Sequence, residues 1–249
     1  MKNTLKTFAC TLVLITSFPA FSGLIDFEST AVGTTPVDNG VIELSDIFMS
    51  GGVSVRFGFD TDYDDVLDTS AIFEQVSNID EKKGSGFKGY DGEKDKAAPG
   101  YESLLGDFFL RQSTPYKPFG VFTILYDADN PVTAASGEIW DIDGKKNTEQ
   151  FLVEVFNGTT LVDSVQSPLS SDLSLNGKPW TFGFEGLPNI TKIEVTFIGS
   201  KTTGIGLAFN NFSPTENIPQ PAKVATPSVL LIFLTALIIL SYRQSKMTA

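Results

Sequence analysis

The sequence contains no histidine and a single cysteine, Cys10. Without histidine the chain can form no Ser-His-Asp triad and no imidazole metal site, and it lacks the usual general base near neutral pH. Cys10 lies in an apolar stretch near the N-terminus, so the rest of the chain offers no thiol nucleophile, disulfide or ordinary zinc site. Carboxylates, Lys, Tyr and Arg are the remaining candidates for catalysis.

Convincing amphipathic helices are also missing from residues 23–213, where short β-prone runs are separated by turns rich in Gly, Pro and Asn. The runs expected to form strands are residues 24–28, 52–59, 71–76, 107–111, 119–126, 137–142, 150–156, 159–165, 179–185, 191–198 and 204–212. The 21 Phe suit a sandwich core, because aromatic side chains supply much of its buried area. The sequence therefore predicts an all-β fold with one jelly-roll-like β-sandwich domain over residues 23–213.

Two connections between these runs are distinctive. Asn157-Gly158 separates two alternating runs, which favours a hairpin with a type I′ turn, because both corner positions of that turn need a positive φ. Residues 80–100 are rich in Gly, Lys, Glu and Asp and are expected to form a long exposed loop.

Positive charge is scarce. Lys and Arg number 18 against 30 Asp and Glu, which gives a net charge of −12. Such a surface repels nucleic acid and anionic lipid and attracts divalent cations. Nucleic acid is therefore not an expected partner.

The first 22 residues are typical of a signal peptide. Two lysines precede an apolar run over residues 8–18, and Ala20 and Ser22 place small residues at positions −3 and −1 of a cleavage site before Gly23. The sequence therefore predicts export of the chain.

Residues 225–249 are typical of a membrane-spanning tail. An apolar run from Val229 to Leu240 is followed by Arg243 and Lys246, as expected for a helix with a cytoplasmic basic end. Residues 214–224 are polar and Pro-rich and are expected to form a semi-extended linker.

The tail also carries a family resemblance. Thr226-Pro227-Ser228 stands directly before the apolar run. A short Pro-containing signature, a hydrophobic helix and a basic end resemble a PEP-CTERM sorting signal, although the usual signature is Pro-Glu-Pro-Ser. The resemblance implies recognition by an exosortase in the bacterial inner membrane, and a link to exopolysaccharide or biofilm. A plain membrane anchor is the alternative.

The body of the chain is similar to the ectodomains of the same family. Residues 25–28, 136–144 and 202–212 resemble their first, central and last strands. This resemblance implies a β fold at the cell surface or in the extracellular matrix, and it implies no particular chemistry.

The densest acidic cluster is the candidate metal site. Asp60, Asp62, Asp64 and Asp68 occupy positions 1, 3, 5 and 9 of a run that resembles the calcium loops of thrombospondin type 3 repeats, with Asp65 at position 6 in place of Gly. Calcium takes six to eight oxygen ligands, and alternate residues of a tight loop can aim several carboxylates at one point. A solvated acidic turn is the alternative.

Two further metal sites are weaker hypotheses. Asp141 and Asp143 follow a predicted strand and could be joined by Glu149. Glu28 and the pair Asn210-Asn211 occupy the places where many carbohydrate-binding jelly rolls hold a structural calcium.

Sugar binding calls for exposed aromatic rings beside polar side chains. The amphipathic candidates are Tyr63, Tyr90, Tyr101, Tyr116, Trp140 and Trp180. Tyr90 and Tyr101 are favoured as carbohydrate-binding residues, because the loop around them offers no obvious core to fill.

The favoured interpretation is an exported, non-catalytic surface or matrix protein that binds carbohydrate in a calcium-dependent way. A glycoside hydrolase or polysaccharide lyase on a jelly roll is the runner-up, since paired carboxylates could supply its chemistry. A purely structural surface component is the third interpretation.

Overall fold

The computed structural model describes residues 23–76, 93–113, 120–142, 148–170, 175–202 and 205–217. The expected signal peptide, the tail with Thr226, Pro227 and Ser228, Tyr90, Tyr116 and Asp143 all lie outside these ranges. Within these ranges, no helix combines the length and apolar character needed to cross a membrane.

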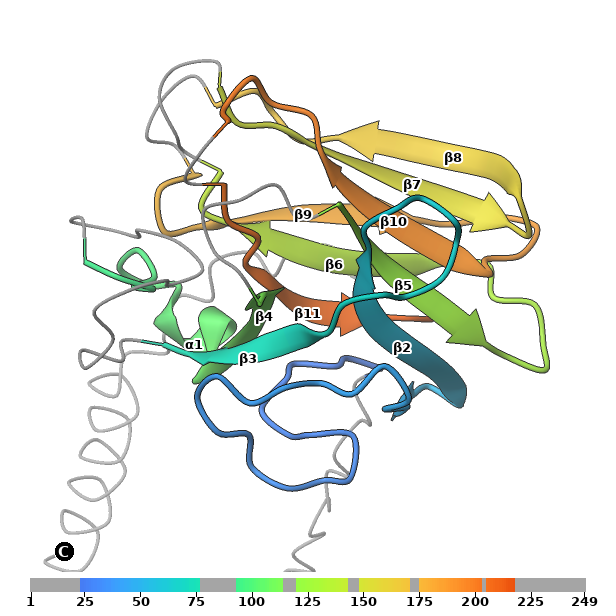
Figure 1. The fold of residues 1–249 in the computed structure, drawn as a ribbon, viewed down its shortest axis with the longest axis horizontal. Helices are drawn as coiled ribbons and strands as arrows, with labels where there is room; N and C mark the ends of the chain where they lie inside the picture. The colour runs from blue at the N-terminus through green and yellow to red at the C-terminus, as the bar shows by residue number, and fades with distance from the viewer. Residues whose placement is uncertain are drawn as a thin grey trace, which may run out of the picture.

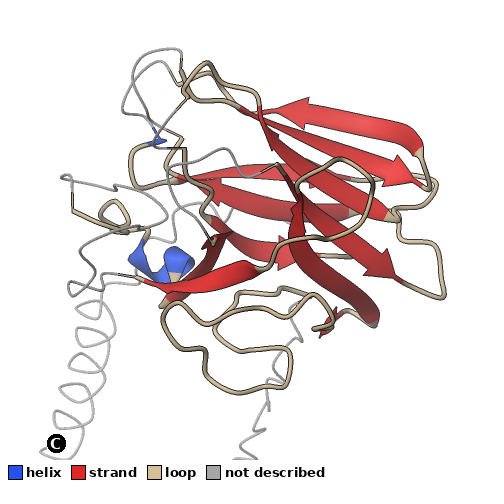
Figure 2. Ribbon diagram, in the orientation of Figure 1, coloured by secondary structure: helices blue, strands red, loops and turns tan. Residues whose placement is uncertain are grey.

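In the described part of the chain, eleven antiparallel strands form two sheets that pack face to face (Figure 1). The six-stranded sheet has the order β1 (Phe48–Ser50), β2 (Val53–Asp60), β5 (Val121–Asp127), β10 (Lys192–Phe197), β7 (Phe151–Asn157), β8 (Thr160–Gln166). The five-stranded sheet has the order β3 (Ala71–Gln75), β4 (Phe108–Gln112), β11 (Phe209–Ser213), β6 (Ala135–Trp140), β9 (Pro179–Phe184). Figure 2 shows how little of the described chain is helical. The predicted all-β sandwich is confirmed.

Phenylalanine rings fill the space between the sheets. Phe57 and Phe122 point inward from the six-stranded sheet, and Phe209 points inward from the five-stranded sheet. The ring centroids of Phe122 and Phe209 are 4.9 Å apart, and Phe27 lies 5.2 Å from Phe57. Side chains of a strand alternate between its two faces, so the residues next to Phe57, Phe122 and Phe209 in their strands point away from the core.

The prediction of a first strand over residues 24–28 is wrong. The structure keeps only one bridge there, between Ile25 and Phe212. Phe27 has φ 59°, which ends the extended conformation, and its side chain is almost fully buried. A strand pattern and a buried turn both require apolar residues, so the sequence pattern did not distinguish them.

Two short elements were not expected from the sequence. The first is β1, which pairs with β2 across Gly51-Gly52. The second is α1 (Glu102–Leu105), a single helical turn. Leu105 from α1 joins Phe109, Trp140 and other residues in a second apolar cluster, on the face of the five-stranded sheet opposite the main core.

The predicted hairpin between β7 and β8 is confirmed, but the predicted turn type is wrong. Asn157 pairs with Thr160, so the corner residues are Gly158 and Thr159. Gly158 has φ 59°, while Asn157 and Thr159 have no positive φ. Positive φ at the first corner alone fits a type II′ turn, in which Gly takes that position.

Candidate metal site and adjoining pocket

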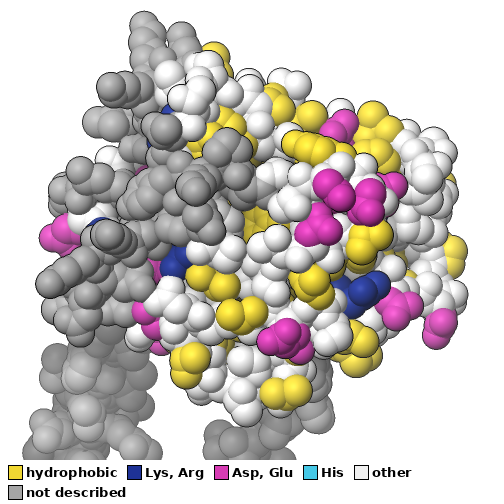
Figure 3. Space-filling model, in the orientation of Figure 1, with side chains coloured by type: hydrophobic (Ala, Val, Ile, Leu, Met, Phe, Trp, Pro, Cys, Tyr) yellow, Lys and Arg dark blue, Asp and Glu magenta, His cyan; other side chains and the backbone are white. Residues whose placement is uncertain are grey.

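The acidic loop joins β2 to β3 across the outer face of the six-stranded sheet. Asp60 ends β2 opposite Val121 of β5, and Gly120 lies against it. A Cβ on Gly120 would lie 2.3 Å from the carbonyl oxygen of Asp60, so only Gly permits this approach. Figure 3 shows acidic side chains gathered where the loop crosses this face. The exposed ones are Asp62, Asp64, Asp65 and Asp68.

Backbone hydrogen bonds fold the loop around Asp60, which is 3% exposed. Its two carboxylate oxygens accept from the N–H groups of Tyr63 (2.6 Å) and Asp65 (3.0 Å). On the returning limb, Asp68 accepts from the N–H and the hydroxyl of Thr61, both at 2.8 Å. A carboxylate has about four acceptor positions, so each of these groups keeps capacity for a cation.

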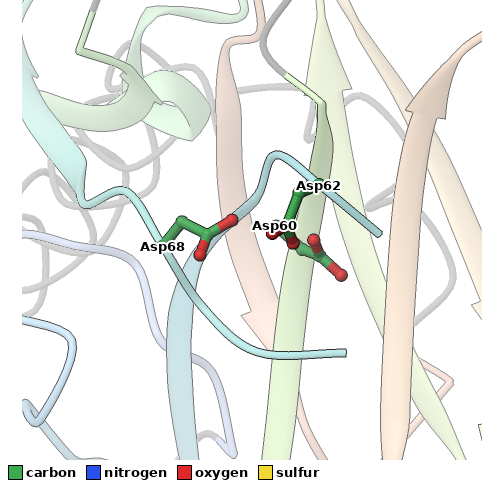
Figure 4. A group of neighbouring side chains, drawn as sticks. All are labelled: Asp60, Asp62 and Asp68. Atoms are coloured by element: carbon green, nitrogen blue, oxygen red, sulfur yellow. The ribbon is translucent and has the colours of Figure 1, made fainter. Parts of the chain in front are cut away.

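Three of the four predicted ligands come together. Carboxylate oxygens of Asp60, Asp62 and Asp68 lie within 4.8 Å of one another. In Figure 4 the carboxylate of Asp68 points across the loop toward the other two. Asp64 is not in this group, and it accepts from the N–H of Val66 instead. Three anionic oxygens on two limbs of one loop suit a hard cation such as calcium, with the remaining ligands from backbone or solvent.

Asp65 has the backbone that its position requires. Its φ is 69°, in the left-handed region that Asp tolerates better than most residues other than Gly. Its side chain turns away from the three carboxylates and forms an ion pair with Lys192.

The electrostatics of the loop favour a bound cation. Desolvation, and then the negative charges of Asp64, Asp68 and Asp60, raise the pKa of Asp62. Hydrogen bonds from Thr61 lower the pKa of Asp68. Among the carboxylates of the loop, repulsion therefore acts on Asp62 in particular, which stands between Asp60 and Asp64 in the sequence.

A pocket of about 190 Å³ opens beside the loop. Its lining residues come from the end of β2, from the loop, from β5, from the β7–β8 hairpin and from β10. They are Asp60, Tyr63, Asp65, Val121, Phe156, Thr159, Lys192 and Glu194. Asp60 belongs both to this pocket and to the three-carboxylate group.

Lys192 is the centre of the pocket's polar contacts. It is 7% exposed, and its ammonium group contacts the carboxylates of Asp65 and Glu194 and lies 4.4 Å from the ring centroid of Phe156. Desolvation lowers its pKa, but the hydrogen bonds to the two carboxylates outweigh this effect, and the pKa lies above its ordinary value. The ammonium group is therefore charged and held in place.

In the second predicted metal site, the described carboxylates have other partners. Glu149 forms an ion pair with Lys201, and Asp141 accepts a hydrogen bond from the N–H of Gly177. Asp143, which was predicted to share that site with Asp141, is outside the described residues.

At the other predicted metal site, the side chains of Glu28, Asn210 and Asn211 form hydrogen bonds to the backbone. Glu28 accepts from the N–H groups of Asp107 and Phe108. Asn210 and Asn211 donate their side-chain N–H groups to the carbonyl oxygens of residues 105 and 104. The two amides therefore present donors where a metal would need oxygens, and they tie α1 to β11.

Of the aromatic candidates that lie within the described ranges, one is strongly exposed. Among the described residues Tyr63 alone is an exposed aromatic, at 69%. Tyr101 is partly buried against the second apolar cluster, and the ammonium of Lys178 lies over its ring. Trp140 is buried, and Trp180 packs against the main core.

An ionisable group that was not expected from the sequence lies beside the second apolar cluster. Glu138 of β6 is 3% exposed and accepts hydrogen bonds from Trp140 (3.2 Å) and Asn211 (2.8 Å). Burial raises its pKa to about 7, although the two hydrogen bonds act in the opposite direction. It lies on the other sheet from the acidic loop.

Sequence reasoning also missed Lys192, Glu194 and Phe156. A signal was present, because Lys192 and Glu194 are charged residues two apart in a predicted strand and so share one face. The partner Asp65 is 127 positions away, and only the fold brings it to Lys192.

Comparisons with known proteins identify no family. No family model and no curated protein matches the sequence. Among solved structures, the enzymatically active domain of tailspike protein 4 of bacteriophage CBA120 is similar over 65% of this chain and 17% of its own, with 16% sequence identity and a TM-score of 0.25. The chain thus spans less than a fifth of that protein's length, and a similarity this weak carries no argument about function.

Proposed function

We propose that this chain is an exported, non-catalytic protein of the cell surface or matrix that binds calcium at its acidic loop and carbohydrate beside it. The observation that carries the proposal is the group formed by Asp60, Asp62 and Asp68, held by backbone hydrogen bonds next to a pocket with an exposed aromatic ring.

Calcium binding is tested by the thermal stability of the purified chain in EGTA and in about 10 mM calcium, roughly 10–100 times the Kd of extracellular calcium modules. A ligand that binds only the folded state at that excess stabilises it by about 1.4–2.7 kcal/mol. For a domain of this size the melting temperature should rise by about 3–10 °C. An unchanged melting temperature would show that the loop is only an acidic turn.

Carbohydrate binding is tested on an array of bacterial and plant glycans, with calcium and with EGTA. The protein should bind at least one glycan on the array, and this binding should be stronger with calcium. If it binds no glycan in either buffer, the protein is better described as a structural surface component.

The rival function is a polysaccharide-active enzyme. A hydrolase of that class needs one carboxyl group that donates a proton and a second that acts as nucleophile or base. The carboxylates of Asp65 and Glu194 both accept from the ammonium of Lys192, so neither is arranged as a proton donor. Release of reducing ends from a retained glycan would favour the enzyme instead.

Export and sorting form a separate part of the proposal. Signal-peptide cleavage before Gly23 and processing near Ser228 would give a mature chain without its basic end. Intact-mass analysis of surface protein measures both ends. Protein that still carries residues through Lys246 would favour a plain membrane anchor.

A further inference from the structure

The pocket beside the acidic loop combines an aromatic wall with a fixed polar array. Phe156 of β7 lies directly opposite Lys192 of β10 in the sheet, and this register places the ammonium group over the ring. Tyr63 projects from the loop at the rim, 69% exposed. The pocket therefore offers one protected ring and one exposed ring on the same side of the molecule.

The polar groups are oriented before any ligand arrives. The ammonium group of Lys192 is held by Asp65 and Glu194, and Asp65 is fixed in turn because its N–H donates to buried Asp60. Carboxylate oxygens accept hydrogen bonds, an ammonium group donates them, and the Thr159 hydroxyl can do both. A ligand with many hydroxyl groups satisfies such a mixed array, since each hydroxyl is both donor and acceptor.

Charge and size restrict the ligand further. Three carboxylates, Asp60, Asp65 and Glu194, and one ammonium group line the pocket, so it carries excess negative charge and disfavours an anion. A calcium ion at the loop would offset this only in part, because its two charges meet the three carboxylates of Asp60, Asp62 and Asp68. An organic cation would have to displace Lys192 from its position over Phe156. A volume of about 190 Å³ is below the roughly 300–1,000 Å³ of sites for drug-sized ligands. One small neutral ring fits these limits.

We propose that this pocket binds a single uncharged pyranose unit of a polysaccharide, with the ring of Tyr63 against one sugar face and Lys192, Asp65 and Glu194 bonded to its hydroxyls. The inference rests on the proposed carbohydrate-binding function, and it adds the site and the sugar class. The charge of the pocket disfavours uronic acids and sulfated sugars.

The test is saturation-transfer NMR on the full chain in a detergent without a sugar headgroup. The probes are the methyl glycosides of glucose, galactose and mannose, with glucuronate and galacturonate as the charged set, each in calcium and in EGTA. At least one neutral glycoside should give a signal, and neither uronate should.

Variants then locate the site. Tyr63→Ala should weaken binding of the neutral glycoside about tenfold or more, as expected for loss of a main contact residue. Tyr63→Phe keeps the ring and should retain most of the affinity. Glu194→Gln should also weaken binding, because one nitrogen replaces an accepting oxygen. Met49→Ala is the matched control, since Met49 is 71% exposed and does not line the pocket.

Each outcome separates the two proposals. Neutral-sugar binding that survives Tyr63→Ala and Glu194→Gln overturns the pocket and leaves the carbohydrate-binding function standing. Binding of uronates alone overturns the neutral class. A signal from none of the probes overturns the pocket, and only the glycan array then decides the wider function.

Discussion

At the scale of single residues, Glu138 couples the stability of the fold to pH. It lies buried between Trp140 and Asn211, and its pKa is raised from 4.5 to about 7. Between these pH values the folded chain keeps the proton and the unfolded chain loses it, so rising pH favours unfolding. The contribution of protonated Glu138 to the free energy of unfolding is complete below about pH 4.5 and is lost as the pH rises through 7.

The predicted size of this effect is about 3 kcal/mol, from 1.36 kcal/mol for each pH unit between the two pKa values. Glu138→Gln keeps the shape of the side chain and still accepts hydrogen bonds, but it does not titrate. The unfolding free energy of this variant should therefore fall by about 3 kcal/mol less than that of the natural chain as the pH rises. Urea denaturation of both proteins between pH 4.5 and 8 measures the difference. Parallel pH profiles for the two proteins would contradict the prediction.

Asp62 is the residue on which calcium binding should depend most. Desolvation and the charges of Asp64, Asp68 and Asp60 raise its pKa. Asp62→Asn should therefore relieve repulsion in the absence of calcium, and in its presence should replace an anionic ligand by a neutral oxygen. The calcium-induced rise in melting temperature should therefore become smaller, while stability in EGTA is equal or higher.

The control for this prediction is Asp141→Asn. Asp141 accepts one hydrogen bond from Gly177, which an Asn side chain can also accept, and it is not in the three-carboxylate group. It should keep the full calcium response. If Asp62→Asn keeps it as well, the cation does not bind where the three carboxylates meet.

At the scale of elements, the β7–β8 hairpin distinguishes two turn geometries. With Gly158 at the first corner and Asn157 in the strand, only position 158 needs a positive φ. Gly158→Ala should cost about 1–2 kcal/mol of unfolding free energy, because a Cβ is strained in the left-handed region.

Asn157→Ala should be nearly neutral by the same argument, within about 0.5 kcal/mol. In the type I′ turn predicted from the sequence, both substitutions would be costly. Chemical denaturation of the two variants decides between the geometries, since only a type I′ turn makes Asn157→Ala destabilising.

At the scale of the whole molecule, stability depends on one aromatic core. Phe209 of β11 is fully buried and has ring contacts with Phe27, Phe57, Phe122 and Phe182, among others. These contacts join both sheets and the N-terminal segment, so a change at this position is felt by the entire sandwich.

Phe209→Ala should lower the free energy of unfolding by about 3–5 kcal/mol, the usual cost of a cavity left by a buried Phe. That is a large part of the 5–15 kcal/mol typical of a domain. Met49→Ala, at an exposed position, should change it by less than about 0.5 kcal/mol. Equilibrium denaturation gives both values, and equal effects of the two substitutions would contradict a single shared core.

The sandwich was predictable because local patterns carry it. Alternating apolar residues, 21 Phe and Gly-rich turns indicate half-buried strands whatever their partners are. The acidic loop was predictable for the same reason, since Asp60, Asp62 and Asp68 lie within nine positions. That three of the four predicted ligands converge follows from the short reach of one loop.

Tertiary structure decided what depends on distant partners. Phe27 is buried by a turn instead of a strand, because φ 59° directs its ring into the core. Asp65 meets Lys192, and Lys192 meets Phe156, only after β2, β10 and β7 have been placed in one sheet. The sequence by itself determined which residues are apolar, charged or able to turn. Which of them share a pocket depends on strand order and register, and these minimise the free energy of the whole chain and not of any segment.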